Sequence, residues 1–147
     1  MSKREDIIAD IITKLDAVTS PIEFKKITRE PFEVDELSDA QFPACYVQTG
    51  DETRETSTLG GVASGKRQGT INFSIVGYVK GTTSNIDTLR NQLIEVVEET
   101  LDDDISRAGN ALNTELIEAS SDEGVLFPYG GVRIVISVVY EFTRGTS

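Results

Sequence analysis

The stretch VRIVISVVYEFT at residues 132–143 decides the fold of this chain more than any other. One face carries an apolar side chain at every second position: Val132, Ile134, Ile136, Val138, Tyr140 and Phe142. The other face is polar but is interrupted by Val135 and Val139. Alternation with a period of two is typical of a β-strand. Because apolar residues occur on both faces, the sequence predicts a strand in the middle of a sheet.

A second alternating stretch, TINFSIVGYVK at residues 70–80, predicts another strand of the same sheet. Its apolar face contains Ile71, Phe73, Ile75 and Val79, and its polar face is typical of a half-buried antiparallel strand. Shorter strands are predicted at 23–29, 44–49 and 111–119. The last of these is ambiguous between strand and helix, and we interpret it as a strand.

Two stretches have the apolar spacing of amphipathic helices. The first stripe consists of Ile7, Ile8, Ile11, Ile12, Leu15 and Val18. Ser2 and Glu5 fit a capping box at its start, and Pro21 ends the pattern. The second stripe consists of Ile86, Leu89, Leu93, Val96, Val97 and Leu101. We expect Ser84 or Asn85 to cap this helix, and the carboxylates at 102–104 to end it because they oppose the helix dipole.

These elements predict a single α+β domain over residues 1–147. We expect two amphipathic helices packed on one face of a mainly antiparallel sheet, with a long hairpin loop between two of its strands. The loop is the polar stretch GDETRETSTLGGVASGKRQG at 50–69, which lacks apolar periodicity. Long loops of this kind in compact domains are usually functional or disordered, and we expect this one to be flexible.

The composition excludes several classes of function. The chain has 25 acidic and 14 basic residues, a net charge of −11, and no histidine. Such an acidic surface argues against tight binding to a nucleic-acid backbone. The lack of histidine rules out Ser-His-Asp and Cys-His catalysis and histidine-ligated zinc. The single Cys45 is expected to be a buried, unreactive side chain in a protein from a reducing compartment.

The stretch GGVASGKR at 60–67 is one residue away from a phosphate-binding loop. Gly60, Gly65 and Lys66 match the motif, but Arg67 replaces the hydroxyl residue that would bind magnesium. The alternating strand at 70–80 follows, whereas the motif needs a helix whose N-terminus faces the phosphate. We therefore expect no nucleotide site here.

No other constellation predicts chemistry. The cluster Asp102–Asp104 lacks the spacing and the glycine of a calcium loop, so we interpret it as a solvated helix end. No pair of carboxylates stands in an apolar setting that would suit acid–base catalysis. We expect no enzyme activity, no cofactor and no metal. The N-terminal stretch does not resemble a signal peptide, and no apolar run is long enough to cross a membrane.

The charges of the 50–69 stretch are polarised, with acids early and bases late. Complementary charges on one exposed segment suit contacts between subunits. We predict that assembly contacts are made by Asp51, Glu52, Arg54, Glu55, Lys66 and Arg67. The alternatives are ordinary solvated charge and a hairpin tip without a role.

The order of elements resembles the tail terminator, or tail completion, proteins of long-tailed bacteriophages. The resemblance runs through five stretches: DIIADIITKL, FPACYVQT, GTINFSIVGYVKG, IDTLRNQLIEVVEETL and GGVRIVISVVYEFTRG. Its closest parts are FPA at 42–44 and YEFTR at 140–144.

The resemblance implies a virion structural protein of the tail or neck, made in the cytoplasm of a bacterial host. It implies a homohexameric ring that caps the tail tube, ends tube polymerisation and joins the tail to a head connector or stopper protein. DNA would only pass through the channel of the ring. The alternatives are another head–tail connector subunit, or a cellular acidic module that binds a partner at a sheet edge.

Overall fold

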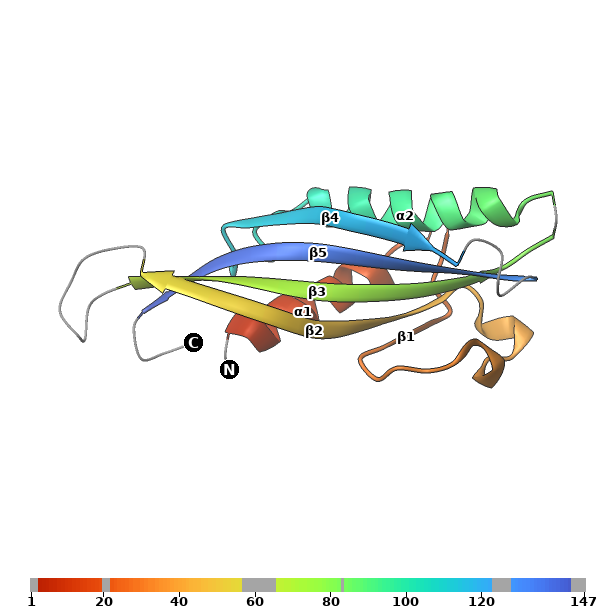
Figure 1. Cartoon of the computed structure of the whole chain (residues 1–147), viewed down its shortest axis with the longest axis horizontal. Helices are drawn as coiled ribbons and strands as arrows, with labels where there is room; N and C mark the ends of the chain where they lie inside the picture. The colour runs from red at the N-terminus through yellow and green to blue at the C-terminus, as the bar shows by residue number, and fades with distance from the viewer. Residues whose placement is uncertain (1–2, 20–21, 57–65, 83, 123–127, 144–147) are drawn as a thin grey trace.

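Among the described residues, five β-strands form one sheet in the order β1-β2-β3-β5-β4 in this computed structural model (Figure 1). The strands are β1 (Lys26–Thr28), β2 (Ala44–Thr56), β3 (Lys66–Lys80), β4 (Asn113–Ser121) and β5 (Tyr129–Thr143). The helices are α1 (Lys3–Asp16), α2 (Ile86–Asp102) and two short 3-10 helices, η1 (Val34–Glu36) and η2 (Asp39–Gln41). The structure describes residues 3–19, 22–56, 66–82, 84–122 and 128–143.

Strands β3 and β5 form the centre of the sheet, as the alternating patterns predicted. Their register runs without a break from Lys66 opposite Thr143 to Lys80 opposite Tyr129. Their inward residues are fully buried, including Ile71, Phe73, Ile75, Ile134 and Val138. The stretch at 111–119, which the sequence left ambiguous, is the strand β4 and pairs with β5.

The prediction of a mainly antiparallel sheet is wrong, because the sheet is mixed. Strand β1 pairs with β2 in parallel, with Lys26 opposite Ala44, whereas the other neighbours are antiparallel. A parallel pair needs a long connection that returns the chain to the same end of the sheet. The acidic segment at 29–43, which contains η1 and η2, is that connection. Strand β1 has only three residues, too few for its side-chain pattern to reveal its direction.

The connection between β1 and β2 packs on the sheet face opposite to the helices. The buried ring of Phe32 lies 5.3 Å from Tyr46 on β2 and 5.9 Å from Tyr78 on β3, centroid to centroid. The ammonium group of Lys26 lies 4.8 Å above the centre of the Phe32 ring. Burial raises the pKa of Tyr78 above its usual value. These contacts position the short parallel strand at the edge of the sheet.

Both helices pack on the other face of the sheet and contact each other. Helix α1 buries Ile7, Ile8, Ile11 and Leu15, and α2 buries Leu93, Val97 and Leu101 in the same core. Helix α2 approaches β3 closely at Gly77, where an added Cβ would lie 2.8 Å from the methyl groups of Leu93. Glycine is therefore needed there so that the helix can lie flat on the strand.

The predicted start of α2 is correct in place but not in mechanism. Asn85 is the N-cap residue, yet its side chain makes no hydrogen bond to the helix amides. Instead, Asn85 Oδ1 accepts hydrogen bonds from the amide and the hydroxyl of Thr82, at 2.7 and 3.1 Å. The side chain thus stabilises the turn before the helix. Ser2, the predicted cap of α1, lies outside the described residues.

The prediction of a loop over 50–69 is also wrong in part. Residues 50–56 belong to β2 and residues 66–69 belong to β3, and the two strands stay paired as far as Thr56 and Arg67. Residues 57–65 lie outside the described residues. Polar residues form strands here because hydrogen bonds between the backbones, rather than burial of an apolar face, hold the strands together. Strands of this kind show no apolar periodicity in their sequence.

Candidate assembly surfaces

The far ends of three strands extend past both helices and form an arm (Figure 1). We define the arm as residues 52–56 of β2, 66–71 of β3 and 138–143 of β5, which are in register with one another. The helical layer does not cover its outer part, so apolar burial contributes less there than in the rest of the sheet. Other interactions must hold the arm in place.

A polar network connects β2 and β5 across β3 at the base of the arm. The Tyr140 hydroxyl donates a hydrogen bond of 2.8 Å to Glu52 Oε2, and Arg54 Nε donates to the same oxygen. Arg54 Nη2 also donates to the Tyr140 hydroxyl at 3.3 Å. Burial raises the pKa of Tyr140, and the hydrogen bond to Glu52 adds to the rise. The hydroxyl therefore keeps its proton, and its role as a donor, well into the alkaline range.

Aromatic stacking continues the network toward the end of the arm. The rings of Tyr140 and Phe142 are stacked at 5.4 Å, and the Arg54 guanidinium lies 4.5 Å above the centre of the Phe142 ring. Gly69 makes this packing possible, because a Cβ there would lie 2.5 Å from Tyr140 Cε1. The ring thus lies directly on the backbone of β3, which only glycine permits.

The first turn of α1 also contacts the base of the arm. Arg4 Nη1 lies 3.7 Å from Glu52 Oε1, and Lys3 Nζ donates a hydrogen bond to the backbone carbonyl of Glu141. The carboxylate of Glu52 is therefore shared by groups from α1, β2 and β5. Since the Glu52 side chain is only 12% exposed, these partners replace the water that would otherwise solvate its charge.

The structure brings the six predicted contact residues together in the arm or beside it: Asp51, Glu52, Arg54, Glu55, Lys66 and Arg67. Their surroundings differ. Glu52 and Arg54 point toward the core face and interact with each other and with Tyr140. Arg67 is partly exposed and lies opposite Thr56 and Phe142 in the strand register. Their role in assembly stays a prediction.

Asp51 is exposed, and a β-bulge positions it. The register of β2 against β3 shifts between Thr49, which is opposite Phe73, and Glu52, which is opposite Ile71. Two residues of β2, Gly50 and Asp51, therefore lie opposite the single residue Asn72 of β3. A Cβ on Gly50 would lie 2.7 Å from the backbone oxygen of Asn72, which explains the glycine. Bulges turn a side chain outward and increase the local twist. Asp51 is therefore presented to solvent at the base of the arm.

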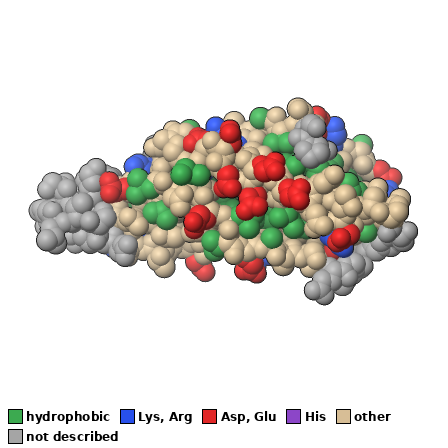
Figure 2. All heavy atoms as spheres, turned by 90° about the horizontal axis from the view of Figure 1, so that it is seen from above, with side chains coloured by type: hydrophobic (Ala, Val, Ile, Leu, Met, Phe, Trp, Pro, Cys, Tyr) green, Lys and Arg blue, Asp and Glu red, His purple; other side chains and the backbone are tan. Residues whose placement is uncertain are grey.

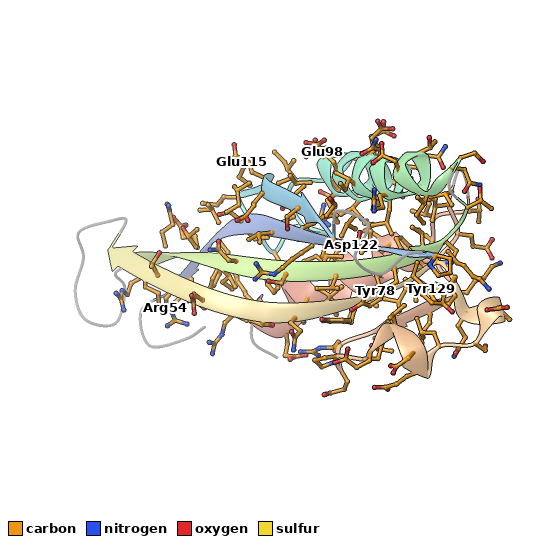
Figure 3. The ribbon with its side chains drawn as sticks, turned by 45° about the vertical axis from the view of Figure 1, so that its right-hand side comes forward. Arg54, Tyr78, Glu98, Glu115, Asp122 and Tyr129 are labelled. Atoms are coloured by element: carbon orange, nitrogen blue, oxygen red, sulfur yellow. The ribbon has the colours of Figure 1, made fainter. Side chains whose placement is uncertain are left out.

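The sequence analysis missed a second surface, formed by α2 and the edge strand β4. Viewed from this side, acidic side chains gather at the centre of the surface and cationic ones lie toward its margins (Figure 2). Exposed carboxylates come from both elements: Glu95, Glu98, Glu99, Asp102, Glu115 and Glu118. Glu98 and Glu115 reach the same margin of the molecule (Figure 3). Counting charges segment by segment could have revealed this concentration.

Arg107, in the connection between α2 and β4, is fully buried. The sequence patterns did not predict this burial. The guanidinium of Arg107 donates hydrogen bonds to the backbone carbonyls of Leu101, at 2.5 Å, and of Asp104. Its Nη1 atom lies 3.2 Å from Asp10 Oδ2 on α1. A cation at the C-terminus of a helix offsets the negative end of the helix dipole. The carboxylates at 102–104 are unfavourable at the negative end of the helix dipole, and the positive charge of Arg107 offsets them.

The backbone of this connection is unusual, with positive φ at Arg107, Ala108 and Gly109. Asp104 stabilises it, because its carboxylate accepts hydrogen bonds from Ser106 Oγ and from the Ala108 amide, at 2.5 and 2.9 Å. These bonds, with a smaller effect of Arg107, lower the pKa of Asp104 to about 2. The expectation that Asp102–Asp104 is merely a solvated helix end is thus too simple for Asp104.

The described residues offer little that could bind a small molecule or a metal. An open hollow of about 330 Å³ lies on the uncovered sheet face, lined by Tyr46, Tyr78 and Arg133 among others. It is shallow and contains no cluster of catalytic groups. Within the described ranges, no three His, Cys, Asp or Glu side chains are grouped as metal ligands. In that same part of the chain, no helix is long and apolar enough to span a membrane.

Two predictions about individual motifs can be compared with the structure. The sequence predicted that a strand, not a helix, follows the near-match to a phosphate-binding loop, and Lys66 is indeed the first residue of strand β3. Gly60 and Gly65 lie outside the described residues. Cys45 is completely buried, and burial raises the pKa of its thiol to about 12. The prediction of a buried, unreactive cysteine is confirmed.

The architecture is thus an α+β fold with a mixed five-stranded sheet and two helices on one of its faces. No protein-family model matches the chain, and no curated protein matches it. Among solved structures, the chain is similar to one from the "Virion of native gene transfer agent (GTA) particle". That alignment has a TM-score of 0.38 and 8% sequence identity, and it covers 96% of this chain and 92% of the other. A similarity at this level transfers no role to this chain.

Proposed function

We propose that this protein is a structural subunit of a phage-like virion and acts by self-association. The observation that supports the proposal best is the arm. Its strands remain paired beyond the helical layer, and hydrogen bonds among Glu52, Arg54 and Tyr140 link β2 to β5. A projection that is held rigid in the isolated subunit loses little conformational entropy when it binds a neighbour.

The composition of the arm also supports a contact role. Its outer residues are mostly polar and charged, so the arm adds no large apolar patch to the surface of the free subunit. The outer edge of β2 is paired with β1 only over Ala44–Tyr46, and within the described residues no strand pairs with the rest of that edge. Unpaired edges are available to the strands of neighbouring subunits.

The finer role that we propose is that of a tail terminator, because the order of elements resembles that family. In this role, subunits form a hexameric ring that caps the tail tube and contacts the tube protein on one side. The other side faces the head connector or stopper, and DNA passes through the ring without being held. The protein needs no catalytic activity or cofactor for this function.

Charge reversal in the arm tests the proposal. We expect the purified protein to form rings, alone or on tail tubes, that are visible by negative-stain electron microscopy. Asp51→Lys changes an exposed charge at the base of the arm and is expected to reduce ring formation measured by light scattering. The control is Asp35→Lys, which makes the same charge change at an exposed residue of η1.

Two outcomes would contradict the proposal. A protein that stays monomeric at high concentration and leaves the length of tail tubes unchanged does not act by self-association. If particles lacking the protein had heads that leak DNA but tails of normal length, the protein would be a stopper rather than a terminator. Equal effects of the two charge reversals would show that the arm is not the contact surface.

A further inference from the structure

We propose that the outer edge of β4, together with the acidic side chains around it, binds a basic β-strand of a partner protein. We call this surface the acidic edge and define it as β4 (Asn113–Ser121) and the exposed carboxylates of α2. The bound segment would extend the sheet as an additional strand next to β4. This inference does not depend on the arm or on the proposed tail function.

The acidic edge offers a long stretch of strand backbone at the border of the sheet. Strand β4 is the last strand of the sheet, and in the described part of the chain only β5 pairs with it. It has nine residues, three times as many as β1 at the opposite edge. Proteins usually protect such edges with charged side chains, proline, β-bulges or very short strands. Strand β4, NTELIEASS, contains neither lysine nor proline, and its only charged residues are acidic. Such an edge is protected against another acidic strand but admits a basic one.

The second half of β4 is uncovered on both faces. From Ile117 to Ser121 every residue is exposed, although alternate residues should be buried if α2 covered one face. Ile117 is 53% exposed, and Leu112 just before the strand is 55% exposed. Ala119 and Ser120 have small side chains that let another backbone approach closely. This half of the strand is therefore accessible to a partner and offers it some apolar surface.

A bulge gives the acidic edge its charge pattern. The register of β4 against β5 shifts between Leu116 and Glu118, with Glu115 opposite Ser137 and Glu118 opposite Val135. In a regular strand, residues 115 and 118 would point to opposite faces. The extra residue, Ile117, puts both carboxylates on the face that the helices leave uncovered. A strand added next to β4 would then place basic side chains opposite both of them.

The charge of the chain is concentrated at this surface. Residues 87–122 contain ten Asp and Glu residues and only two Arg residues, so they carry −8 of the net charge of −11. Both arginines are buried at 9% and 0% exposure, and both form ion pairs: Arg90 with Asp122 and Asp87, and Arg107 with Asp10. The exposed charged side chains of this segment are therefore all acidic, with eight carboxylates and no base.

Charge also decides the kind of partner. Residues 1–86 carry a net charge of −3 and residues 123–147 a net charge of zero, so a second copy of this chain is not basic outside its own acidic segment. Its basic run at 25–29 already has partners within the chain, since Lys25 pairs with Glu23, Arg29 pairs with Glu5 and Lys26 lies over the Phe32 ring. Like charges facing each other across an interface disfavour association, whereas opposite charges speed it and select the partner. A different protein with a basic, strand-forming segment fits the acidic edge better than a second copy does.

A peptide-binding experiment tests this inference. The probe is a fluorescein-labelled peptide of alternating lysine and valine with the same nine-residue length as β4, and the control peptide alternates glutamate and valine. We expect fluorescence anisotropy to detect binding of the lysine peptide only, with an affinity that falls as the NaCl concentration rises. The amides of β4 should become protected from hydrogen exchange when the peptide binds.

The decisive variant is Glu115→Lys/Glu118→Lys, which should weaken binding by about tenfold or more. The matched control is Glu30→Lys/Asp35→Lys, which makes the same charge change at exposed residues of the β1–β2 connection, at the opposite edge of the sheet, and should leave the affinity unchanged. Both variants replace exposed side chains, and circular dichroism checks that they fold. Equal binding to the two variants, protection outside β4, or binding of the glutamate peptide would overturn the inference. Loss of self-association in the Glu115→Lys/Glu118→Lys variant would overturn it too, because a second copy would then occupy the edge.

Discussion

The same three strands pass through two regions of this molecule that are held together in different ways. In the body, which is the part of the sheet under α1 and α2, the strands bury fully apolar residues such as Phe73 and Ile136. In the arm, the core face still buries Ile71, Val138 and Phe142, but Glu52, Arg54 and Tyr140 join them there and interact through hydrogen bonds. The comparison teaches that one sheet can continue from an apolar core into a polar projection, provided that the polar groups satisfy one another.

The largest effect is expected in the body. Phe73→Ala removes a completely buried ring and leaves a cavity beneath the helices. This change is expected to lower the free energy of unfolding by about 3–5 kcal/mol, measured by urea denaturation. Body and arm should lose protection from hydrogen exchange together, because the arm has no core of its own. If the arm stayed protected while the body unfolded, it would be an independent folding unit.

A smaller effect is expected in the arm. Tyr140→Phe keeps the stacking on Phe142 but removes the hydroxyl that donates to Glu52. We expect a loss of about 1 kcal/mol, with faster amide exchange at residues 52–56 and unchanged exchange around Phe73. The control is Tyr46→Phe, which makes the same change on the opposite face of the body. An equal loss of protection throughout the sheet would contradict the separation of the two regions.

The smallest effect separates the regions by pH. The pKa of Asp104 is lowered to about 2 from its usual value near 3.8, so its ionised form stabilises the folded protein. That contribution is present above about pH 4 and is lost as the pH falls toward 2. An NMR titration should show the connection between α2 and β4 loosening over this range, and the pH response of the arm amides should be the same in the wild type and in Asp104→Asn. In Asp104→Asn this pH dependence should be absent. Titration of Asp104 near its usual pKa would mean that its hydrogen bonds do not persist in solution.

Side-chain periodicity predicted the elements that bury one face. Strands β3 and β5 and both helices lie where their apolar patterns put them, because an element that packs against a core must repeat its apolar residues with its own period. The same logic explains why the arm was missed. Residues 50–56 and 66–69 pair through their backbones, and their core-facing positions hold polar groups, so a search for apolar alternation interprets them as a loop.

The candidate surfaces were only partly predictable for a similar reason. The acidic edge depends on which strand is last in the sheet and on the bulge at Ile117, and neither can be read from local sequence. The burial of Arg107 was equally hidden, since an arginine after a helix is ordinarily a solvated charge. Its burial depends on Asp10 and on helix carbonyls that come together only in the folded chain.

By itself, the sequence determined the α+β class, the positions of the helices and central strands, the buried state of Cys45 and the absence of histidine chemistry. These properties follow from composition and from patterns within single elements. The tertiary structure alone decided the parallel direction of β1, the extension of the sheet into an arm, and the side on which the acidic charge gathers. Those features arise from contacts between residues far apart in the chain, such as Tyr140 with Glu52, and no local pattern encodes them.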